Sequence, residues 1–483
     1  MALNHRKIMS YKVKKINIMA SYDWSMRAAM MNFLNCLDPV ITYKKDKYKL
    51  EQGRIVAKPL RAGARLNDES DFIVDRTVHW NDYYKFFAQQ AINCQMRIAN
   101  HSNTFHTHDK HATYDLITRA LHPSDRLPVT VLLPQFRPYT EEQEKQQLWE
   151  YEQELIIGNT KFGWDEHRRH IDWEEVNKKM ERTIRWKKKN KIMYDQFYCK
   201  GNYLLETVEK EFKGQFPLFL KKAFGGGGSE VFKVHSMDEL YYQYDQTGSK
   251  SFHLQEAIEN YDNFVRCMAI GPQVLPMEFQ PDKPLHEHYS PAKLKLDKDV
   301  CDRTINYVLF INAYYRWTYN SFEALIKDGS IHPIDFANAC PDSNFTSLHV
   351  HFPWLICALV KWVSYCAVTE KDMRIDMEQN KYLKILNDPS VPQIEKYNHQ
   401  VKLSKEYFEI EKFNDFCEKN FPDIEDKMVE FYDKHFDEII AYAIEMSDFP
   451  EGEQERFYHY YKDMMDNIFR ANAKEYLTTV IYK

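Results

Sequence analysis

The sequence lacks the features that mark secreted, disulfide-rich or membrane proteins. Its nine cysteines are scattered without a single C-x-x-C pair, so we expect a reduced cytoplasmic compartment rather than a disulfide framework. The basic N-terminus has no apolar core of the kind that a signal peptide needs. The longest apolar run, Phe352 to Val368, contains Lys361 and is too short to span a bilayer. This run predicts a buried helix, and we expect no membrane partner.

Composition and charge narrow the class of protein further. A chain of 483 residues is long enough for two or three domains with real cores. Hydrophobic residues make up 44% and aromatic residues 15%, which is typical of a globular protein and not of a disordered one. The 65 lysines and arginines are outnumbered by 71 acidic residues, for a formal charge of −6. This balance argues against nucleic acid as a partner of the protein as a whole.

The stretch from Phe216 to Val234 reads as a strand, a glycine loop and a second strand. Four consecutive glycines, Gly225 to Gly228, have a large unfolded-state entropy and are a poor choice for a structural turn. Their backbone N–H groups are well suited to phosphate oxygens. No GK[ST] follows and the next element is a strand, which excludes a phosphate-loop NTPase. A hairpin tip without function stays open as the alternative.

The order of several weak motifs resembles the ATP-grasp superfamily. The glycine loop is followed by QEAI, residues Gln255–Ile258, and by the hairpin SFEALIKDGSIHPIDFAN. The chain resembles in particular the ligase branch that contains glutathione synthetases and the ribosomal-protein glutamate ligase. The resemblance covers roughly residues 70 to 350, without the segment from about 138 to 195.

The resemblance implies roles for individual residues. Lys221 matches the phosphate-binding lysine, and Lys222 stands where the family often has proline. Successive side chains of a strand point to opposite faces, so only one of these two lysines can face a nucleotide. Arg266 matches a strand arginine that stabilises the transferring phosphoryl group through bidentate contacts. The other positions implied to bind the nucleotide are Lys110, the glycines Gly225, Gly226, Gly227 and Gly228, the linker residues Gln255, Glu256 and Ile258, and either Glu259 or Asp262 at the ribose.

The hairpin at residues 321–338 contains two acids that can be examined without the family. Asp328-Gly329 is a strong turn signal, and Glu323 and Asp335 lie on either side of it. A two-residue loop would place the two carboxylates on opposite faces, and a three-residue loop would place them on one face. Like charges on one face repel, unless a hard divalent cation bridges them. Two solvent-facing carboxylates are the alternative.

The resemblance implies that these acids bind Mg²⁺, with Mn²⁺ as an alternative. The family adds an asparagine after the second acid, and the candidate here is Asn338. Asn338 follows Asp335 by three residues, whereas the family pattern usually has two. The departure leaves the role of Asn338 open but not that of the acids.

We therefore predict an α/β and α+β protein with an ATP-grasp fold. The predicted parts are a small N-terminal α/β domain at 1–108, an ATP-grasp domain at 109–365 with a helical insertion at about 138–195, and a C-terminal helical extension at 366–483. In the first part, a strand over Val13–Ala20 precedes a helix that Asp23 can cap. The insertion ends in a basic run at 178–191, for which a solvated helix face is the default interpretation. The C-terminal helices could pack on the core or form an oligomer interface.

The predicted activity is ATP-dependent ligation of a carboxylate to an amine or a thiol, with an acyl-phosphate intermediate and release of ADP. The expected partners are ATP and small-molecule or peptide substrates, and the expected location is cytoplasmic. Two alternatives stay open: phosphoryl transfer to an acceptor other than a carboxylate, and nucleotide binding without catalysis. The sequence contains no credible Ser/His/Asp or Cys/His nucleophile arrangement.

Overall fold

The computed structural model describes most of the chain, in two compact units. The described residues are 11–20, 23–66, 70–78, 81–100, 110–133, 141–162, 169–197, 203–223, 230–247, 250–338, 340–373, 376–447, 449–478 and 480–481. The first unit contains residues 1–127 and 260–483, and the second contains residues 128–259. These units divide the chain by packing, and the three-part domain division stays a prediction.

The first unit begins with a five-stranded, mostly parallel sheet of order β2-β3-β1-β4-β5. Its central strand is β1, in which apolar residues alternate with polar ones. Ile16 and Ile18 therefore point to the same side of the sheet, where both are fully buried. The predicted first strand and helix are confirmed. The elements are β1 (Lys12–Ala20), α1 (Trp24–Leu37), β2 (Ile41–Tyr43), β3 (Asp46–Arg54), β4 (Phe72–Arg76), α2 (Asp82–Asn93) and β5 (Arg97–Ala99).

Asp23 does precede the first helix, but its side chain does not cap that helix. The carboxylate instead accepts a hydrogen bond of 2.8 Å from Nε of Arg76, the last residue of β4. Both side chains are buried, so an ion pair with the guanidinium satisfies the carboxylate better than the helix N–H groups would. The expectation of an N-cap at Asp23 was wrong for this reason.

A second, antiparallel sheet in the same unit has the order β15-β14-β12-β13-β16. Helices α4 and α9 pack against it. The β12–β13 turn requires glycine: Gly271 has φ 58°, and a Cβ atom there would lie 2.3 Å from the Trp362 ring. The elements are α4 (Lys110–Thr118), β12 (Asn263–Ile270), β13 (Gln273–Glu278), η1 (Leu285–Glu287), α9 (Lys298–Tyr315), β14 (Tyr319–Lys327), β15 (Ser330–Asn338) and β16 (Val480–Ile481).

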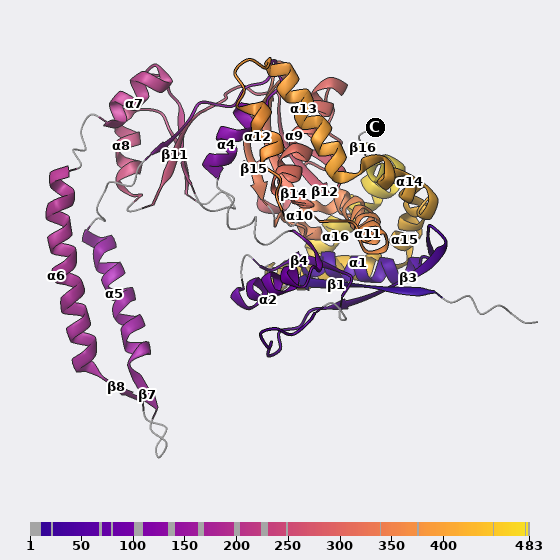
Figure 1. Ribbon diagram of the computed structural model, residues 1–483, viewed down its shortest axis with the longest axis horizontal. Helices are drawn as coiled ribbons and strands as arrows, with labels where there is room; N and C mark the ends of the chain where they lie inside the picture. Colours follow the sequence, from indigo (N-terminus) through magenta and orange to yellow (C-terminus); the bar gives the residue numbers. More distant parts are fainter. Residues whose placement is uncertain are drawn as a thin grey trace, which may run out of the picture. The chain divides into compact units, whose positions relative to one another are not determined.

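The predicted buried helix is α11 (Phe352–Thr369), at the centre of the core of the first unit. The stretch Phe345–Thr369 is apolar and long enough to cross a membrane, but 94% of its apolar window is buried, as in the core helix of a soluble protein. The C-terminal region is helical as predicted, and Figure 1 shows it in orange and yellow. The end of this region forms strand β16, which pairs with β13 and was not predicted from the sequence. The other elements are α10 (Phe345–Leu348), η2 (His349–His351), α12 (Asn380–Leu386), α13 (Gln393–Phe408), α14 (Ile410–Asn420), α15 (Ile424–Glu445), η3 (Glu451–Glu453), α16 (Gln454–Met464), η4 (Met465–Phe469), η5 (Arg470–Asn472) and α17 (Ala473–Leu477).

The second unit contains a four-stranded antiparallel sheet of order β10-β9-β11-β6. One face carries Leu218, Leu220 and Leu254, which pack against α7 and α8 (Figure 1). The predicted strands on either side of the glycine loop are confirmed. The elements are β6 (Thr130–Leu133), α7 (Tyr203–Phe212), β9 (Leu218–Lys222), β10 (Val231–Val234), α8 (Met237–Asp245) and β11 (Phe252–Glu256).

The insertion is helical, as expected, with one addition. Helices α5 (Glu141–Gly158) and α6 (Trp173–Phe197) pack side by side. A short hairpin of β7 (Thr160–Phe162) and β8 (Arg169–Ile171) joins their ends (Figure 1).

Candidate active site

Glu323 and Asp335 lie directly opposite each other on β14 and β15. The turn between the strands has two residues, Asp328 and Gly329, both with positive φ as a type I′ turn requires. Such a turn alone would place Ile334 opposite Glu323. A bulge at Ile334 shifts the register by one residue and turns Asp335 to the face of Glu323. For a two-residue turn the sequence predicted opposite faces, and the bulge is the reason why the two acids share a face instead.

The same bulge positions Lys110. The displaced carbonyl of Ile334 accepts a hydrogen bond of 2.7 Å from the hydroxyl of Tyr114 on α4. Lys110 lies one helical turn before Tyr114 and therefore on the same face of α4. Its Nζ is 2.8 Å from Oδ2 of Asp335. The bulge thus aligns both acids and docks the helix that carries the lysine.

Arg266 lies next to this pair, on β12. It is directly opposite Glu323 in the ladder, and its Nη1 is 3.4 Å from Oε1 of that residue. The guanidinium carbon lies 5.0 Å from the centre of the Phe279 ring and 5.7 Å from that of Tyr289. Both distances are within the range of cation–π attraction. The rings restrain the arginine while Glu323 balances its charge.

Two cations and two carboxylates therefore alternate across one face of this sheet. Burial works to lower the pKa of Lys110, but the charges of Asp335 and Glu323 raise it above its ordinary value. Burial likewise opposes the charged form of Arg266, while Tyr289, Glu323, Asp342 and Asp335 raise its pKa. Both groups carry a full positive charge at physiological pH.

The two acids fit a metal ion that is also held by phosphate oxygens. Within the described residues, no group of three or more His, Cys, Asp or Glu side chains could hold an ion. Mg²⁺ commonly binds through one or two carboxylates together with substrate phosphates, and two directly opposed acids supply that number. The backbone of Asn338 pairs with Ser321 at the end of β15, and the Asn338 side chain lies outside the described part.

A buried histidine pair, which sequence reasoning missed, holds the segment that carries Tyr289. Nε2 of His349 is 2.8 Å from the carbonyl oxygen of Tyr289, and Nε2 of His351 is 2.9 Å from that of Ser290. Nδ1 of His349 accepts the N–H of Val350, so Nε2 carries the proton. Burial lowers the pKa of His349 to about 3 and that of His351 to about 4, which keeps both rings neutral. No spacing in the sequence indicates these contacts.

Tyr289 is itself a candidate that the sequence did not indicate. Its side chain is 2% exposed, and within the described residues its hydroxyl has no hydrogen-bond partner. Burial raises the pKa of this phenol, so the hydroxyl is a donor at physiological pH. A buried hydroxyl without a partner is unfavourable, and this one belongs to a ring that contacts Arg266.

The segment after β15 is held by residues at the start of α1 and at the end of β4. Ser343 donates its backbone N–H to Asp23 at 3.3 Å, and Phe345 donates to Oγ of Ser25 at 2.9 Å. Arg76 donates to the carbonyl of Pro341. Asp342, which lies on this segment, is one of the charges that raise the pKa of Arg266. Asp342 is therefore a third acid near the site. It lies beyond Asn338, outside the predicted hairpin, and no sequence motif indicated it.

In the second unit, Lys221 and Lys222 have different surroundings, as their alternation predicts. Lys221 lies on the face opposite the helices, and its Nζ donates to Oε1 of Gln255 at 2.8 Å. Gln255 is 1% exposed and donates in turn to Oγ1 of Thr130 at 2.7 Å. Nζ of Lys222 is 2.6 Å from Oε2 of Glu230. Thus Lys221 is bonded to the buried Gln255, whereas Lys222 forms an ion pair with Glu230 on the other face.

The remaining nucleotide candidates are distributed over both units. Gly225 to Gly228 lie outside the described residues. Glu256 exchanges hydrogen bonds with the backbone of Val129, and Ile258 is 7% exposed. Oε1 of Glu259 is 2.9 Å from Nζ of Lys233. Asp262 belongs to the first unit and accepts the N–H of Asp328, which stabilises the β14–β15 turn.

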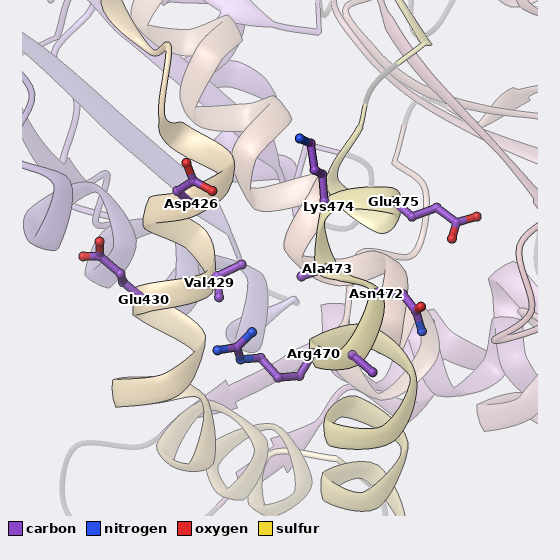
Figure 2. A pocket seen from close by; sticks show the side chains of 9 residues that line it. Asp426, Val429, Glu430, Arg470, Asn472, Ala473, Lys474 and Glu475 are labelled. Carbon is purple, nitrogen blue, oxygen red and sulfur yellow. The ribbon is translucent and has the colours of Figure 1, made fainter.

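The structure thus brings Lys110, Arg266, Glu323 and Asp335 together in the first unit, and Lys221 with Gln255 in the second. A pocket elsewhere contains none of these residues. Figure 2 shows it between α15 and the segment from Arg470 to Glu475. Arg470 pairs there with Asp433 at 2.7 Å. The pocket has no connection with the predicted chemistry.

No protein-family model matches the sequence, and no curated protein matches it. Solved structures do show similarity. The D-alanine–D-alanine ligase of Bacillus anthracis matches at 10% identity over 74% of this chain and 100% of its own, with a TM-score of 0.39. A RimK domain ATP-grasp protein of Sphaerobacter thermophilus matches at 10% over 68% and 92%, with a TM-score of 0.38. A RiPP-associated ATP-grasp ligase of Chryseobacterium gregarium, solved with ADP and with a leader and core peptide, matches at 9% over 74% and 98%, with a TM-score of 0.41.

Proposed function

We propose that this protein is an ATP-grasp ligase that joins a carboxylate to an amine or a thiol through an acyl phosphate and releases ADP. The observation that carries the proposal is the opposed pair Glu323 and Asp335, with Lys110 and Arg266 as their counterions. Phosphoryl transfer depends mainly on charges placed around the phosphate oxygens and requires little from a protein nucleophile. These four side chains supply such charges on one sheet face.

Each residue has a distinct task in this proposal. The resemblance assigns nucleotide binding in the second unit to Lys221, Gln255 and Glu256, together with the glycine loop. In the first unit, Arg266 would bind oxygens of the transferring phosphoryl group, since its guanidinium is oriented by two aromatic rings. Lys110 would neutralise further negative charge. Glu323 and Asp335 would hold Mg²⁺, which when bound polarises the phosphate oxygens.

The test is product analysis. The protein is incubated with ATP, magnesium and pools of amino acids, small carboxylates and peptides, and ADP and new amide or thioester mass are measured. Peptides are included because the Chryseobacterium enzyme was solved with a leader and core peptide. We expect ADP in equal amount to a condensed product. AMP with pyrophosphate would exclude the acyl-phosphate route. ADP with a phosphorylated alcohol would make the protein a phosphotransferase, and tight ATP binding without turnover would make it a nucleotide-binding protein.

A further inference from the structure

Positive charge is concentrated on α6, in a chain whose formal charge is −6. Residues 178–191 contain eight lysines and arginines and one glutamate. Residues 411–466, by contrast, contain seventeen acidic and six basic residues. The net charge of the protein therefore conceals a strongly cationic segment, and the partner of this segment has to be inferred from its own charge.

The cations of α6 form a stripe along one face. Lys178, Arg182 and Arg185 follow one another at spacings of four and three residues, so they share a face of the helix, and all three are exposed. Lys188 extends the stripe by a further turn. Val176 is fully buried on the other side of the helix. The apolar side of α6 is thus already used in packing, while the cationic side is open.

The charges of this stripe are poorly balanced within the protein. Arg185 is 3.3 Å from Glu181 of its own helix, and Lys178 is 3.9 Å from Glu175. In the part of the chain that the structure describes, Arg182 and Lys188 have no carboxylate partner. Like charges one turn apart destabilise a helix, and an external polyanion would remove that repulsion.

An exposed tryptophan lies along the edge of the stripe. Trp186 is 66% exposed and lies one turn after Arg182. Trp149 of α5 and Trp173 at the start of α6 are also exposed, at 55% and 50%, whereas Trp317, Trp354 and Trp362 are each only 1% exposed. An indole ring beside cations is the combination that binds single-stranded nucleic acid, because a base stacks on the ring while phosphates meet the cations.

We propose that the α6 stripe, consisting of Lys178, Arg182, Arg185, Trp186 and Lys188, binds single-stranded nucleic acid. A membrane surface fits less well, since the described residues on the exposed face offer one indole among cations and no continuous apolar strip. An acidic protein segment would use the cations but would gain less from an exposed indole. The acids of α5, such as Glu150 and Glu154, would repel phosphates, so the nucleic acid would bind on the side of α6 away from α5. The inference does not depend on the proposed ligase activity.

The test is fluorescence anisotropy with labelled oligouridylate and oligothymidylate, titrated with the full-length protein at several salt concentrations. Four cations on phosphates predict a slope of about −3 in the logarithm of the binding constant against the logarithm of salt, and roughly half that slope for the double variant R182Q/R185Q. W186A should weaken binding roughly tenfold at every salt concentration. R456A removes an exposed arginine from the acidic segment and is the matched control, with no expected change.

Three results would overturn the inference: no binding at low salt, equal binding by wild type and W186A, or a salt slope that R182Q/R185Q leaves unchanged. Oligoglutamate is added as a second probe. Binding of oligoglutamate without binding of either oligonucleotide would replace the nucleic acid with an acidic protein segment. Circular dichroism of each variant checks that its helix content equals that of wild type, and the single and double variants change no residue of the candidate active site.

Discussion

The two lysines expected at the nucleotide donate hydrogen bonds to different residues. In the first unit, Nζ of Lys110 lies 2.8 Å from a carboxylate oxygen of Asp335. In the second, Nζ of Lys221 lies at the same distance from the amide oxygen of Gln255. Lys110 is thus bonded to one of the two acids proposed to hold the metal, and Lys221 to a linker residue that the resemblance places at the nucleotide. We therefore expect residues near Lys110 to act mainly in the reaction and stability of the protein, and Lys221 to act mainly in nucleotide binding.

The largest expected effect is on turnover in the first unit. Asp335→Asn or Glu323→Gln should lower the turnover of ATP by roughly 100- to 1000-fold, the size of effect seen when a preorganised transition-state charge is removed. The affinity for ATP, measured by calorimetry without magnesium, should change little. Asp328→Asn is the matched control, because it changes an acid of the same hairpin at a turn position that asparagine tolerates. Equal losses in the control and the two variants would remove the case for a metal-binding pair.

The same variants test how the acids affect stability. Repulsion between two like charges alone would make Asp335→Asn more stable. The structure reverses this sign, since each carboxylate faces a cation, and removing one acid takes away the nearest counterion of Lys110 or Arg266. We expect the free energy of unfolding to fall by up to about 1 kcal/mol for these partly exposed pairs. Urea unfolding at pH 7 measures it, and a gain in stability would show that repulsion dominates.

The sequence predicted the elements of this site better than their geometry. Alternation along β9 correctly separated Lys221 from Lys222, since strand periodicity is a local property. The two acids were found from the turn signal, but their shared face depends on a bulge at Ile334 that no local preference indicates. Asp23 looked like a cap because its partner Arg76 is distant in sequence. Tyr289, His349 and His351 were missed for the same reason, because tertiary packing alone brings Tyr289 to Arg266 and the two histidines to the carbonyls of Tyr289 and Ser290.

The next effect concerns binding in the second unit. Lys221→Ala should weaken ATP binding roughly 10- to 100-fold, which corresponds to the loss of one hydrogen bond to a charged group. Lys222→Ala should change it far less, because that side chain pairs with Glu230 on the other face. Calorimetric titration of both variants gives the comparison directly. Equal losses would show that the strand face does not decide which lysine meets the nucleotide.

A smaller effect is expected at Tyr289. Tyr289→Phe removes only the hydroxyl and keeps the ring beside Arg266. If the hydroxyl donates to a reacting group, turnover should fall several-fold while the affinity for ATP stays constant. Tyr307→Phe is a useful contrast, since that hydroxyl already donates to Asp125 and has a structural task. Its loss should lower stability rather than turnover. If Tyr289→Phe lowered the melting temperature and left turnover unchanged, Tyr289 would have a structural role like that of Tyr307.

The last effect is a dependence of stability on pH that arises from His349 and His351. Burial lowers both pKa values in the folded state, to about 3 and about 4, from an ordinary value of 6.5. Between pH 6.5 and 4 the unfolded chain therefore binds more protons than the folded one, so the free energy of unfolding decreases as the pH falls. Asp75 acts in the opposite direction, because burial raises the pKa of its carboxyl from 3.8 to about 7 in the folded state. A comparison of variants with wild type separates the two contributions.

His349→Gln and His351→Gln keep an N–H donor for the carbonyls of Tyr289 and Ser290 but cannot titrate. The double variant should lose less stability than wild type when urea midpoints are measured between pH 7 and pH 4.5, with similar stability at pH 7. His349→Leu removes the donor, and it should lower stability at every pH because the carbonyl of Tyr289 is left unsatisfied. Parallel pH curves for wild type and the glutamine variant would mean that the histidines are not the groups that titrate. In that case, the neutral pair would hold the Tyr289 segment without making it sensitive to acid.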